Sequence, residues 1–227
     1  MFIAMRITGG KLKNRKIKSP PGDSPGVRPT MDALRESLFS ILDQYTDWSS
    51  AQVLDLFSGS GSLGLESISR GAKQVTFVER NEGCRKTILD NIQSMGLSDI
   101  PSISLKGICV FKFLDSEEGK FSLIFADPPF GAIHVEEFLC KLSESSILAP
   151  GSIVVFEGDS KQLGKFLDSD FSSPNPSDKP DLIAADKNQP GSFVFESGVF
   201  QLLRFKKYAA AAVCIFCFCG GKSREEW

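Results

Sequence analysis

In the first half of the chain, segments with the apolar pattern of strands alternate with segments that have the apolar pattern of helices. Short apolar runs at 53–57, 74–78 and 103–105 are typical of buried strands, and helical spacing fills the intervals at 63–69 and 83–95. A helix over 31–42 precedes them, because its leucines and isoleucine recur every three or four positions. The order of strands and helices predicts an α/β fold with a mostly parallel, doubly wound sheet.

The second half of the chain continues this pattern. A strand at 121–126, a helix at 135–144 and a strand at 152–157 follow in order. Two more apolar segments, 193–195 and 199–205, flank Gly198 and predict a C-terminal antiparallel hairpin that closes the sheet edge. Residues 168–181 are rich in Asp and Pro, which is typical of a surface loop.

The segment before the first helix is rich in residues that break regular structure. Four prolines and two glycines within residues 19–30 predict an irregular linker. Thr30 then has the residue type of a helix N-cap, and Asp32 would place a negative charge in the first turn, where it complements the helix dipole.

Charge is distributed unevenly along the chain. The 227 residues are 41% hydrophobic and 24% charged, as in an ordinary globular protein with one main domain. The net charge is −2, but residues 1–30 carry +6 and the remainder −8. The basic residues of that first segment are Arg6, Lys11, Lys13, Arg15, Lys16, Lys18 and Arg28.

Such a density of positive charge is typical of contact with a phosphate backbone, and the alternative is a solvated tail. Ile7, Leu12 and Ile17 lie between the charges, and Gly9-Gly10 marks a turn. This interleaving favours a folded basic β-hairpin over a polar tail.

Six cysteines, Cys84, Cys109, Cys140, Cys214, Cys217 and Cys219, show no paired spacing and predict reduced thiols in the cytoplasm. The last three could resemble a zinc ligand set, but the chain has no second cluster and a single histidine, His134, so we expect no metal. Residues 1–5 are too short for a signal peptide, and the most apolar stretch, 208–219, is too short to span a membrane. These features predict a cytoplasmic protein.

A glycine-rich loop follows the first predicted strand. Gly59, Gly61 and Gly64 form a G-x-G-x-x-G pattern, and Glu79 lies where an acid would bind ribose hydroxyls. Asp55, just before the loop, suits the cationic amino-acid end of S-adenosylmethionine better than a pyrophosphate. The alternatives are that Asp55 caps the next helix and that Glu79 is a solvated strand end.

The fourth predicted strand ends in Asp127-Pro128-Pro129-Phe130. The Asp127 carboxylate and the Pro128 carbonyl could accept hydrogen bonds from an exocyclic amine and orient its lone pair toward a methyl donor. The prolines would make the turn rigid, and Phe130 could stack on a flipped base. The alternative is a simple strand-ending turn. The motif therefore predicts methylation of an amine.

Taken together, these motifs resemble the RsmD family, the bacterial 16S ribosomal RNA guanine-N2 methyltransferases that depend on S-adenosylmethionine. The matching segments are Arg6 to Gly10, Arg15, Arg28 to Thr30, Arg35-Glu36, Leu38-Phe39, Leu54 to Gly61, Gly64 to Glu66, Ser69 to Ala72, Val78-Glu79 and Asp127 to Phe130. The resemblance covers residues 5 to 205 and implies a Rossmann-like class I methyltransferase fold.

The resemblance also implies the roles of individual residues. The substrate would be 16S rRNA within an assembling 30S subunit, contacted by Arg6, Lys11, Lys13, Arg15, Lys16, Arg28 and Arg35, although Arg35 could instead be an ion-pair partner. The cofactor would contact Asp55, Phe57, Gly59, Ser60, Gly61, Gly64, Glu79, Arg80 and Cys109. Cys109 stands where the family usually has an acid or amide that reads adenine, which is a departure from the pattern.

We therefore predict three regions, a basic RNA-binding arm with its linker (1–30), a methyltransferase domain (31–207) and an apolar, Cys-rich tail (208–227). The tail has no evident family counterpart and could be an added strand, a partner surface or a disordered end. Three other functions stay open. They are a DNA adenine-N6 methyltransferase, an NAD-dependent oxidoreductase built on the same glycine loop, and a non-catalytic RNA-binding assembly factor.

Overall fold

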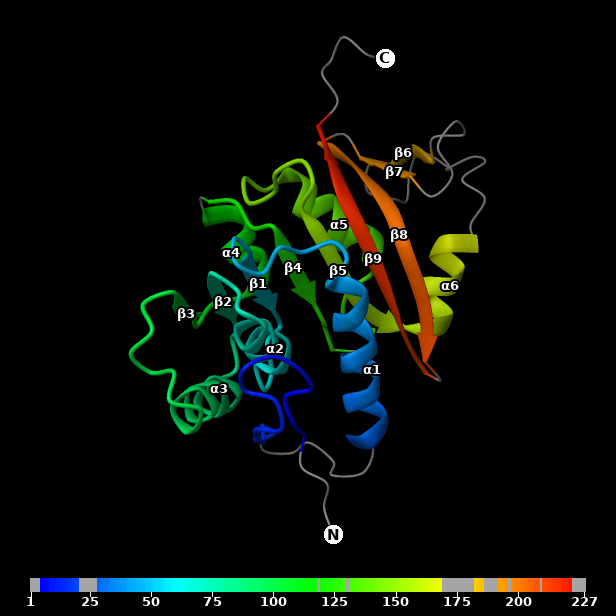
Figure 1. Ribbon diagram of the computed structural model, residues 1–227. Coiled ribbons are helices and arrows are strands. Elements are labelled where there is room, and N and C mark those ends of the chain that lie inside the picture. Colours follow the sequence, from blue (N-terminus) through cyan, green and yellow to red (C-terminus); the bar gives the residue numbers. More distant parts are fainter. Residues whose placement is uncertain are drawn as a thin grey trace. The chain divides into compact units, whose positions relative to one another are not determined.

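The computed structural model describes residues 5–20, 28–117, 119–129, 131–168, 182–185, 192–195, 197–208 and 210–221. The chain divides into two compact units, residues 1–113 and residues 114–227. Figure 1 labels their helices and strands in chain order.

The first unit contains a parallel sheet in the order β3-β2-β1, with β1 at Gln52–Leu56, β2 at Gln74–Val78 and β3 at Ile103–Lys106. Helix α2 (Ser62–Arg70) packs on β1 and β2, and α3 (Glu82–Ser94) connects β2 to β3 (Figure 1). These elements agree with the predicted ranges to within one or two residues. Strand residues of β1 and β2 are almost all buried, which explains their continuous apolar runs.

The basic arm folds as a small antiparallel hairpin, as predicted. Arg6 and Lys16 form an antiparallel bridge, and backbone hydrogen bonds join Ile7 N to Arg15 O and Ile17 N to Met5 O. The side chains of Ile7 and Ile17 are buried. The apolar residues therefore anchor the hairpin in the first unit.

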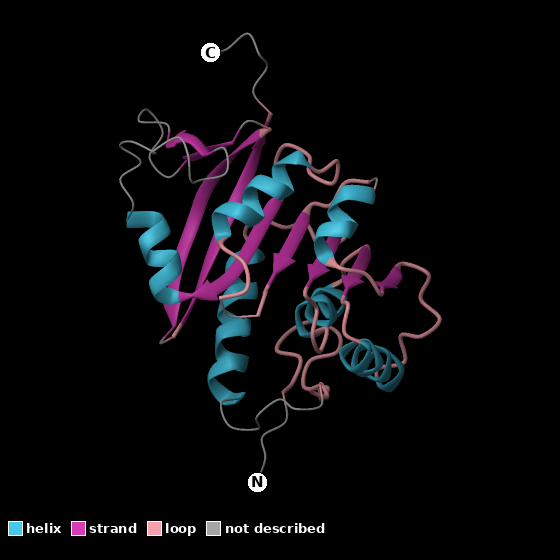
Figure 2. Cartoon of the chain, turned by 180° about the vertical axis from the view of Figure 1, so that it is seen from behind, coloured by secondary structure: helices cyan, strands magenta, loops and turns pink. Residues whose placement is uncertain are grey.

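The second unit orders its strands β4-β5-β9-β8-β7-β6. Strands β4 (Leu123–Ala126) and β5 (Ile153–Asp159) are parallel, and β6 (Leu182–Ala185), β7 (Ser192–Phe195), β8 (Gly198–Tyr208) and β9 (Ala211–Gly220) extend the sheet in antiparallel fashion. Helices α5 (Val135–Glu144) and α6 (Ser160–Asp168) cover one face of these strands (Figure 2). The predicted hairpin of 193–195 and 199–205 is present as β7 and β8.

Strand β9 comes from the apolar tail and lies between β5 and β8. Val155 pairs with Ile215, which in turn pairs with Arg204. The side chains of Cys214 and Phe216 are buried, and Phe216 meets the ring of Phe193 edge-on. Of the three alternatives for this tail, the structure therefore shows a strand, and that strand is internal to the sheet.

Several boundaries differ from the sequence-based predictions. Helix α1 begins at Arg28 and ends at Leu42, so Thr30 lies inside the helix and is not its N-cap. Helix α4 (Val110–Ser116), α6, β6 and β9 were not predicted as such. Most of the predicted loop at 168–181 lies outside the described residues. Among the described helices, none has the length and apolar character that a membrane span requires.

Candidate active site

The loop after β1 makes a sharp turn that only certain residues adopt easily. The φ angles are 57° at Phe57, 54° at Gly59 and 77° at Gly61, all in the left-handed region. Ser58 fixes the turn, because its hydroxyl donates to the Asp55 carbonyl at 2.5 Å and accepts from the Val78 amide at 3.0 Å. The loop is therefore tied to the ends of both β1 and β2.

Two carboxylates hold the loop from its two ends. Asp55 Oδ2 accepts from the Gly64 amide at 2.9 Å, near the start of α2. Glu79 Oε2 accepts from the Gly59 amide at 3.0 Å, and its Oε1 accepts from Asn81 N at 2.7 Å. Asp55 thus caps α2, as the alternative interpretation held, and Glu79 is a loop-binding residue at a half-buried strand end.

The three motif glycines serve different purposes. A Cβ atom on Gly64 would overlap the Phe77 ring, and one on Gly61 would lie 3.2 Å from that ring. A Cβ atom on Gly59 would meet only the Phe57 carbonyl oxygen, at 3.8 Å. Gly61 and Gly64 therefore allow the loop and α2 to pack closely on Phe77 of β2, whereas Gly59 leaves open space beside the Glu79 carboxylate. This arrangement fits a nucleoside ligand whose ribose binds Glu79.

Asn91 of α3 connects the glycine loop to the basic arm. Its buried amide group donates to Ser60 O at 3.0 Å and to Lys18 O at 3.1 Å, and its Oδ1 accepts from Lys18 N at 2.8 Å. One side chain therefore fixes the backbone of both segments. Sequence reasoning did not identify Asn91, since nothing local marks it apart from other helical Asn residues.

Glu66 of α2 holds the other end of the arm. Its fully buried carboxylate accepts from Thr8 N at 2.8 Å, Thr8 Oγ1 at 2.8 Å and Gly9 N at 2.7 Å. The guanidinium groups of Arg35 and Arg70 lie 3.6 Å and 3.5 Å from it. The buried negative charge is therefore well compensated, and the Thr-Gly-Gly segment is a docking element.

The arm presents its positive charges outward. The side chains of Arg6, Lys11, Lys13, Arg15, Lys16 and Lys18 are exposed on the hairpin. Arg35 differs, because it is 4% exposed and its Nη2 donates to the Arg6 carbonyl and to Asp32 Oδ1, both at 2.6 Å. The structure thus shows Arg35 as an internal ion-pair partner. The Arg28 side chain lies outside the described part of the structure.

Two further cofactor candidates lie near the edges of this unit. Arg80 is exposed directly after Glu79, and its carbonyl accepts from Arg85 Nη1 at 2.6 Å. Cys109 is half-buried and its carbonyl accepts from Phe113 N at 3.0 Å, at the start of α4. Cofactor contacts by these two residues stay predictions.

In the second unit, Asp127 and Pro128 follow β4 directly. Pro128 is buried, Asp127 and Pro129 are exposed, and the Pro129 carbonyl accepts from Ala132 N at 3.0 Å. The described part of the motif therefore presents a carboxylate at the carboxyl end of β4. Phe130 lies outside the described residues, so its stacking role stays a prediction.

Glu157 is a candidate site residue that sequence reasoning missed. In the parallel pair of β4 and β5, Ala126 is opposite Phe156, so Asp127 and Glu157 come next on adjacent strands. Burial raises the pKa of Glu157 to about 8, and the negative charge of Asp127 adds to this rise. Glu157 comes after the apolar run 153–156 inside β5, but the sequence does not show the pairing with β4 that brings it beside Asp127.

The same surroundings raise the pKa of Asp127 to about 6 through desolvation. Asp127 nevertheless has an exposed surface, so solvent screens part of this effect, and the shift of Glu157 is the larger of the two. The two groups titrate as a pair.

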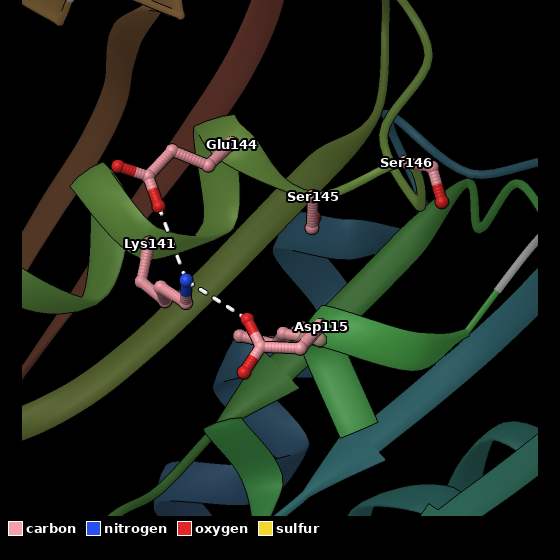
Figure 3. A pocket seen from close by; sticks show the side chains of 6 residues that line it. Asp115, Lys141, Glu144, Ser145 and Ser146 are labelled. Carbon is pink, nitrogen blue, oxygen red and sulfur yellow. Dashed lines mark hydrogen bonds and ion pairs between the residues drawn. The ribbon is translucent and has the colours of Figure 1, made fainter. Parts of the chain in front are cut away.

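A hollow of about 240 Å³ between α4 and α5 is lined by Leu114, Asp115, Lys141, Glu144, Ser145 and Ser146 (Figure 3). Lys141 Nζ lies 2.8 Å from Asp115 and 3.2 Å from Glu144, which raises the pKa of the lysine. The charges of the hollow are thus paired with one another. It lies at the C-terminal end of α5, opposite the strand end that bears Asp127.

The cysteines do not gather with other metal-binding side chains in the described part of the chain, where no group of three His, Cys, Asp or Glu could hold a metal ion. Cys214 is buried in β9, while Cys219 is exposed near its end. Burial raises the pKa of the Cys214 thiol to about 12.

Comparison with known proteins places the chain in a family. The profile described as conserved hypothetical protein 95 matches residues 5–168. Ribosomal RNA small subunit methyltransferase D of Escherichia coli (strain K12) is 33% identical over 155 residues, covering 68% of this chain and 75% of that protein. The protein of the same name from Haemophilus influenzae is 34% identical over 154 residues, covering 67% and 78%. The chain belongs to the RsmD family of methyltransferases.

Solved structures extend the similarity of this RsmD-family chain beyond the matched segment. A candidate methyltransferase from Escherichia coli aligns with a TM-score of 0.69 and 24% identity, covering 97% of this chain and 100% of the other. The ribosomal protein L11 methylase of Lactobacillus delbrueckii subsp. bulgaricus aligns with a TM-score of 0.58 and 20% identity, covering 91% and 86%. These neighbours confirm the Rossmann-like class I methyltransferase fold.

Proposed function

We propose that this chain transfers a methyl group from S-adenosylmethionine to the exocyclic N2 amine of one guanine in 16S rRNA. The observation that carries the proposal is the Asp127-Pro128-Pro129 segment at the carboxyl end of β4, in a chain whose relatives are named for rRNA methylation. The substrate we propose is RNA in the assembling 30S subunit. Because that RNA lies in the cytoplasm, the proposal places the enzyme there.

The first unit supplies the groups that would hold the cofactor. Glu79 would accept hydrogen bonds from the ribose hydroxyls, the backbone at Gly59 would lie against the ligand, and Asp55 would face the amino-acid end. Phe57, Ser60, Arg80 and Cys109 complete the proposed set. When bound, S-adenosylmethionine supplies an electrophilic methyl group on a sulfonium.

The second unit supplies the groups that act on the amine. The Asp127 carboxylate and the Pro128 carbonyl would accept hydrogen bonds from the two N–H groups, which directs the nitrogen lone pair outward. The nitrogen gains a methyl group and must lose one proton, which the Asp127 carboxylate would accept and pass to water. The exposed hairpin would hold the phosphate backbone through Arg6, Lys11, Lys13, Arg15 and Lys16, together with Arg28.

The test is to incubate the purified chain with labelled S-adenosylmethionine and under-methylated 30S subunits, and to identify the product nucleoside by mass spectrometry. We expect N2-methylguanosine, and label on DNA, protein or another nucleoside would contradict the proposal. Asp127→Ala should reduce transfer by at least 100-fold and leave cofactor affinity nearly unchanged. Glu137→Ala, which removes an exposed carboxylate of α5, should retain activity.

A further inference from the structure

We propose that Glu157 reads the Watson–Crick edge of the target guanine, accepting a hydrogen bond from N1–H beside the N2 amine that Asp127 holds. The inference rests on the proposed function and assigns to that site a residue that distinguishes guanine from other purines.

The sheet register brings the two carboxylates together. Ala126, the last residue of β4, is opposite Phe156 of β5; Asp127 directly follows β4, and Glu157 is the next residue of β5. Neighbouring strands lie about 4.8 Å apart, and residues in register project from the same face. That face is the one opposite the face where Phe156 packs against Phe138 of α5. The two carboxylates therefore lie side by side at one strand edge.

The Glu157 side chain makes no hydrogen bond or ion pair with any residue that the structure describes, although it is half-buried. A carboxylate of this kind is normally satisfied by a donor. The Asp127 side chain likewise has no described donor, and its only described interaction is with the charge of Glu157. Two neighbouring acceptors without donors fit a ligand that presents two adjacent N–H groups.

Among the described residues, the groups on the strands next to Glu157 do not supply a positive charge. On β9 its partner is Val213, and the nearest titratable residue of that strand, Cys214, keeps a protonated thiol at neutral pH. Lys206 of β8 is opposite Val213, so it lies two strand spacings, about 10 Å, from Glu157. On β5 itself, the Asp159 carboxylate accepts from the Lys161 and Gln162 amides of α6. Asp127 of β4 is therefore the charge that acts on Glu157.

Guanine presents the complementary pattern. Its Watson–Crick edge carries N1–H and the N2 amine side by side, and both are donors. Adenine carries an amine beside a bare N1 lone pair, which a carboxylate repels. 2-Aminopurine keeps the amine at C2 and also has a bare N1, so it isolates the contact assigned to Glu157. A site with two adjacent carboxylates therefore selects guanine, since the wrong base leaves one acceptor unpaired.

The hydrogen bond between guanine N1–H and Glu157 should depend on pH, because the Glu157 carboxyl group ionises. In the unliganded protein Glu157 holds its proton up to about pH 8, because it is desolvated and lies beside Asp127. Donation from N1–H favours the ionised carboxylate, so guanine binding should tighten as pH rises toward 8. This pH dependence separates a base contact from a merely structural role.

The wild-type reaction is first used to map the methylated position in 16S rRNA. The experiment then uses the full chain, S-adenosylmethionine and reconstituted 30S subunits. Their 16S rRNA carries either guanosine or 2-aminopurine riboside at that position. We expect the kcat/KM of wild type at pH 8.5 to be about 100-fold higher with guanosine than with 2-aminopurine riboside. This ratio lies in the upper part of the range of discrimination expected for one specific base contact. Glu157→Gln and Glu157→Ala should reduce this preference to about fivefold or less. Glu137→Gln is the matched control and should retain it.

A second measurement follows wild-type kcat/KM on guanosine substrate from pH 6.5 to 8.5, where we expect a rise of roughly tenfold or more. In Glu157→Gln the part of this rise above pH 7 should be lost. Full base preference and an unchanged pH profile in both Glu157 variants would overturn the inference while leaving the proposed function intact. Absence of N2-methylguanosine with wild type would overturn both. Unchanged S-adenosylmethionine affinity would show that the variants are folded.

Discussion

Gly59 and Gly64 belong to one loop motif, but different constraints select glycine at each position. A methyl group on Gly64 would overlap the Phe77 ring, whereas one on Gly59 would enter open space with a left-handed φ of 54°. We expect Gly64→Ala to lower the free energy of unfolding by about 1 to 3 kcal/mol through overpacking. Gly59→Ala should lower it by about 1 kcal/mol and weaken S-adenosylmethionine binding at least tenfold.

Urea denaturation measures the loss in the free energy of unfolding, and calorimetry with S-adenosylmethionine measures the loss in cofactor affinity. Equal losses of S-adenosylmethionine affinity in the two variants would show that these glycines do not have separate roles.

Glu157 should make the folded protein less stable at alkaline pH. Its pKa is raised from 4.5 in the unfolded chain to about 8 in the folded one, so the folded state binds the proton more tightly. Its favourable contribution is present below pH 4.5 and is lost as pH rises through 8. Glu157→Gln should therefore stabilise the protein at pH 8.5 by a few kcal/mol more than at pH 5, on the order expected for such a shift.

The measurement is chemical denaturation of wild type and Glu157→Gln at both pH values. A gain that is the same at pH 5 and pH 8.5 would contradict the raised pKa. Cofactor affinity checks that the variant keeps its fold.

Candidate site residues could be selected from the sequence only where an apolar run marked them. Asp55, Glu79 and Asp127 each follow an apolar run. The structure places Glu79 and Asp127 directly after β2 and β4, and Asp55 one residue before the end of β1. Glu157 follows such a run too, but its importance depends on the register with β4, which the sequence does not reveal. Asn91 was unpredictable for the same reason, because its partners Lys18 and Ser60 are distant in sequence.

At the scale of elements, the basic hairpin is a rigid surface rather than a loose tail. Its backbone is fixed by Glu66 and Asn91, while its lysines point outward. We expect the double change Lys13→Glu and Lys16→Glu to weaken RNA affinity at least tenfold at 100 mM salt. The slope of log affinity against log salt should fall by about 1.4 to 1.8, as expected for two lost phosphate contacts.

Filter binding to 16S rRNA across a salt series measures both the RNA affinity and the slope of log affinity against log salt. Lys73→Glu with Lys86→Glu makes the same change in net charge at exposed positions outside the hairpin and should leave the slope unchanged. A similar loss in both double variants would mean that only net charge matters.

Some elements were predicted at their observed ends, and others were missed although their apolar residues have a regular spacing. Strand β2 and helix α5 were predicted at their observed ends. Helix α6 has Gly164 at its centre, which lowers helix propensity, and the sequence alone gave it no clear boundary. Strand β9 reads as a uniform apolar run, because most of its side chains are buried, and such a run does not identify its partner strands.

At the scale of the whole molecule, β9 joins the parallel strands of the second unit to the antiparallel ones. Ile215 pairs with Val155 on one side and with Arg204 on the other. Ile215→Pro removes an amide donor from an internal strand, so we expect a loss of at least 3 kcal/mol and cooperative unfolding of the second unit. Ile215→Val keeps the amide and should lose about 1 kcal/mol.

Thermal unfolding followed by circular dichroism, with hydrogen exchange of the β5 and β8 amides, checks this expectation. Retained protection of β5 in the proline variant would show that the sheet does not depend on β9.

The position of β9 also determines the order in which the sheet can be completed during synthesis. Strand β8 precedes β9 in the chain but reaches β5 only through it. While β9 is still being synthesised, β5 presents an unpaired hydrogen-bonding edge, and β8 with the strands beyond it has nothing to join. A nascent chain stalled before residue 211 should therefore be held by chaperones or degraded, even though every predicted site residue has already been made.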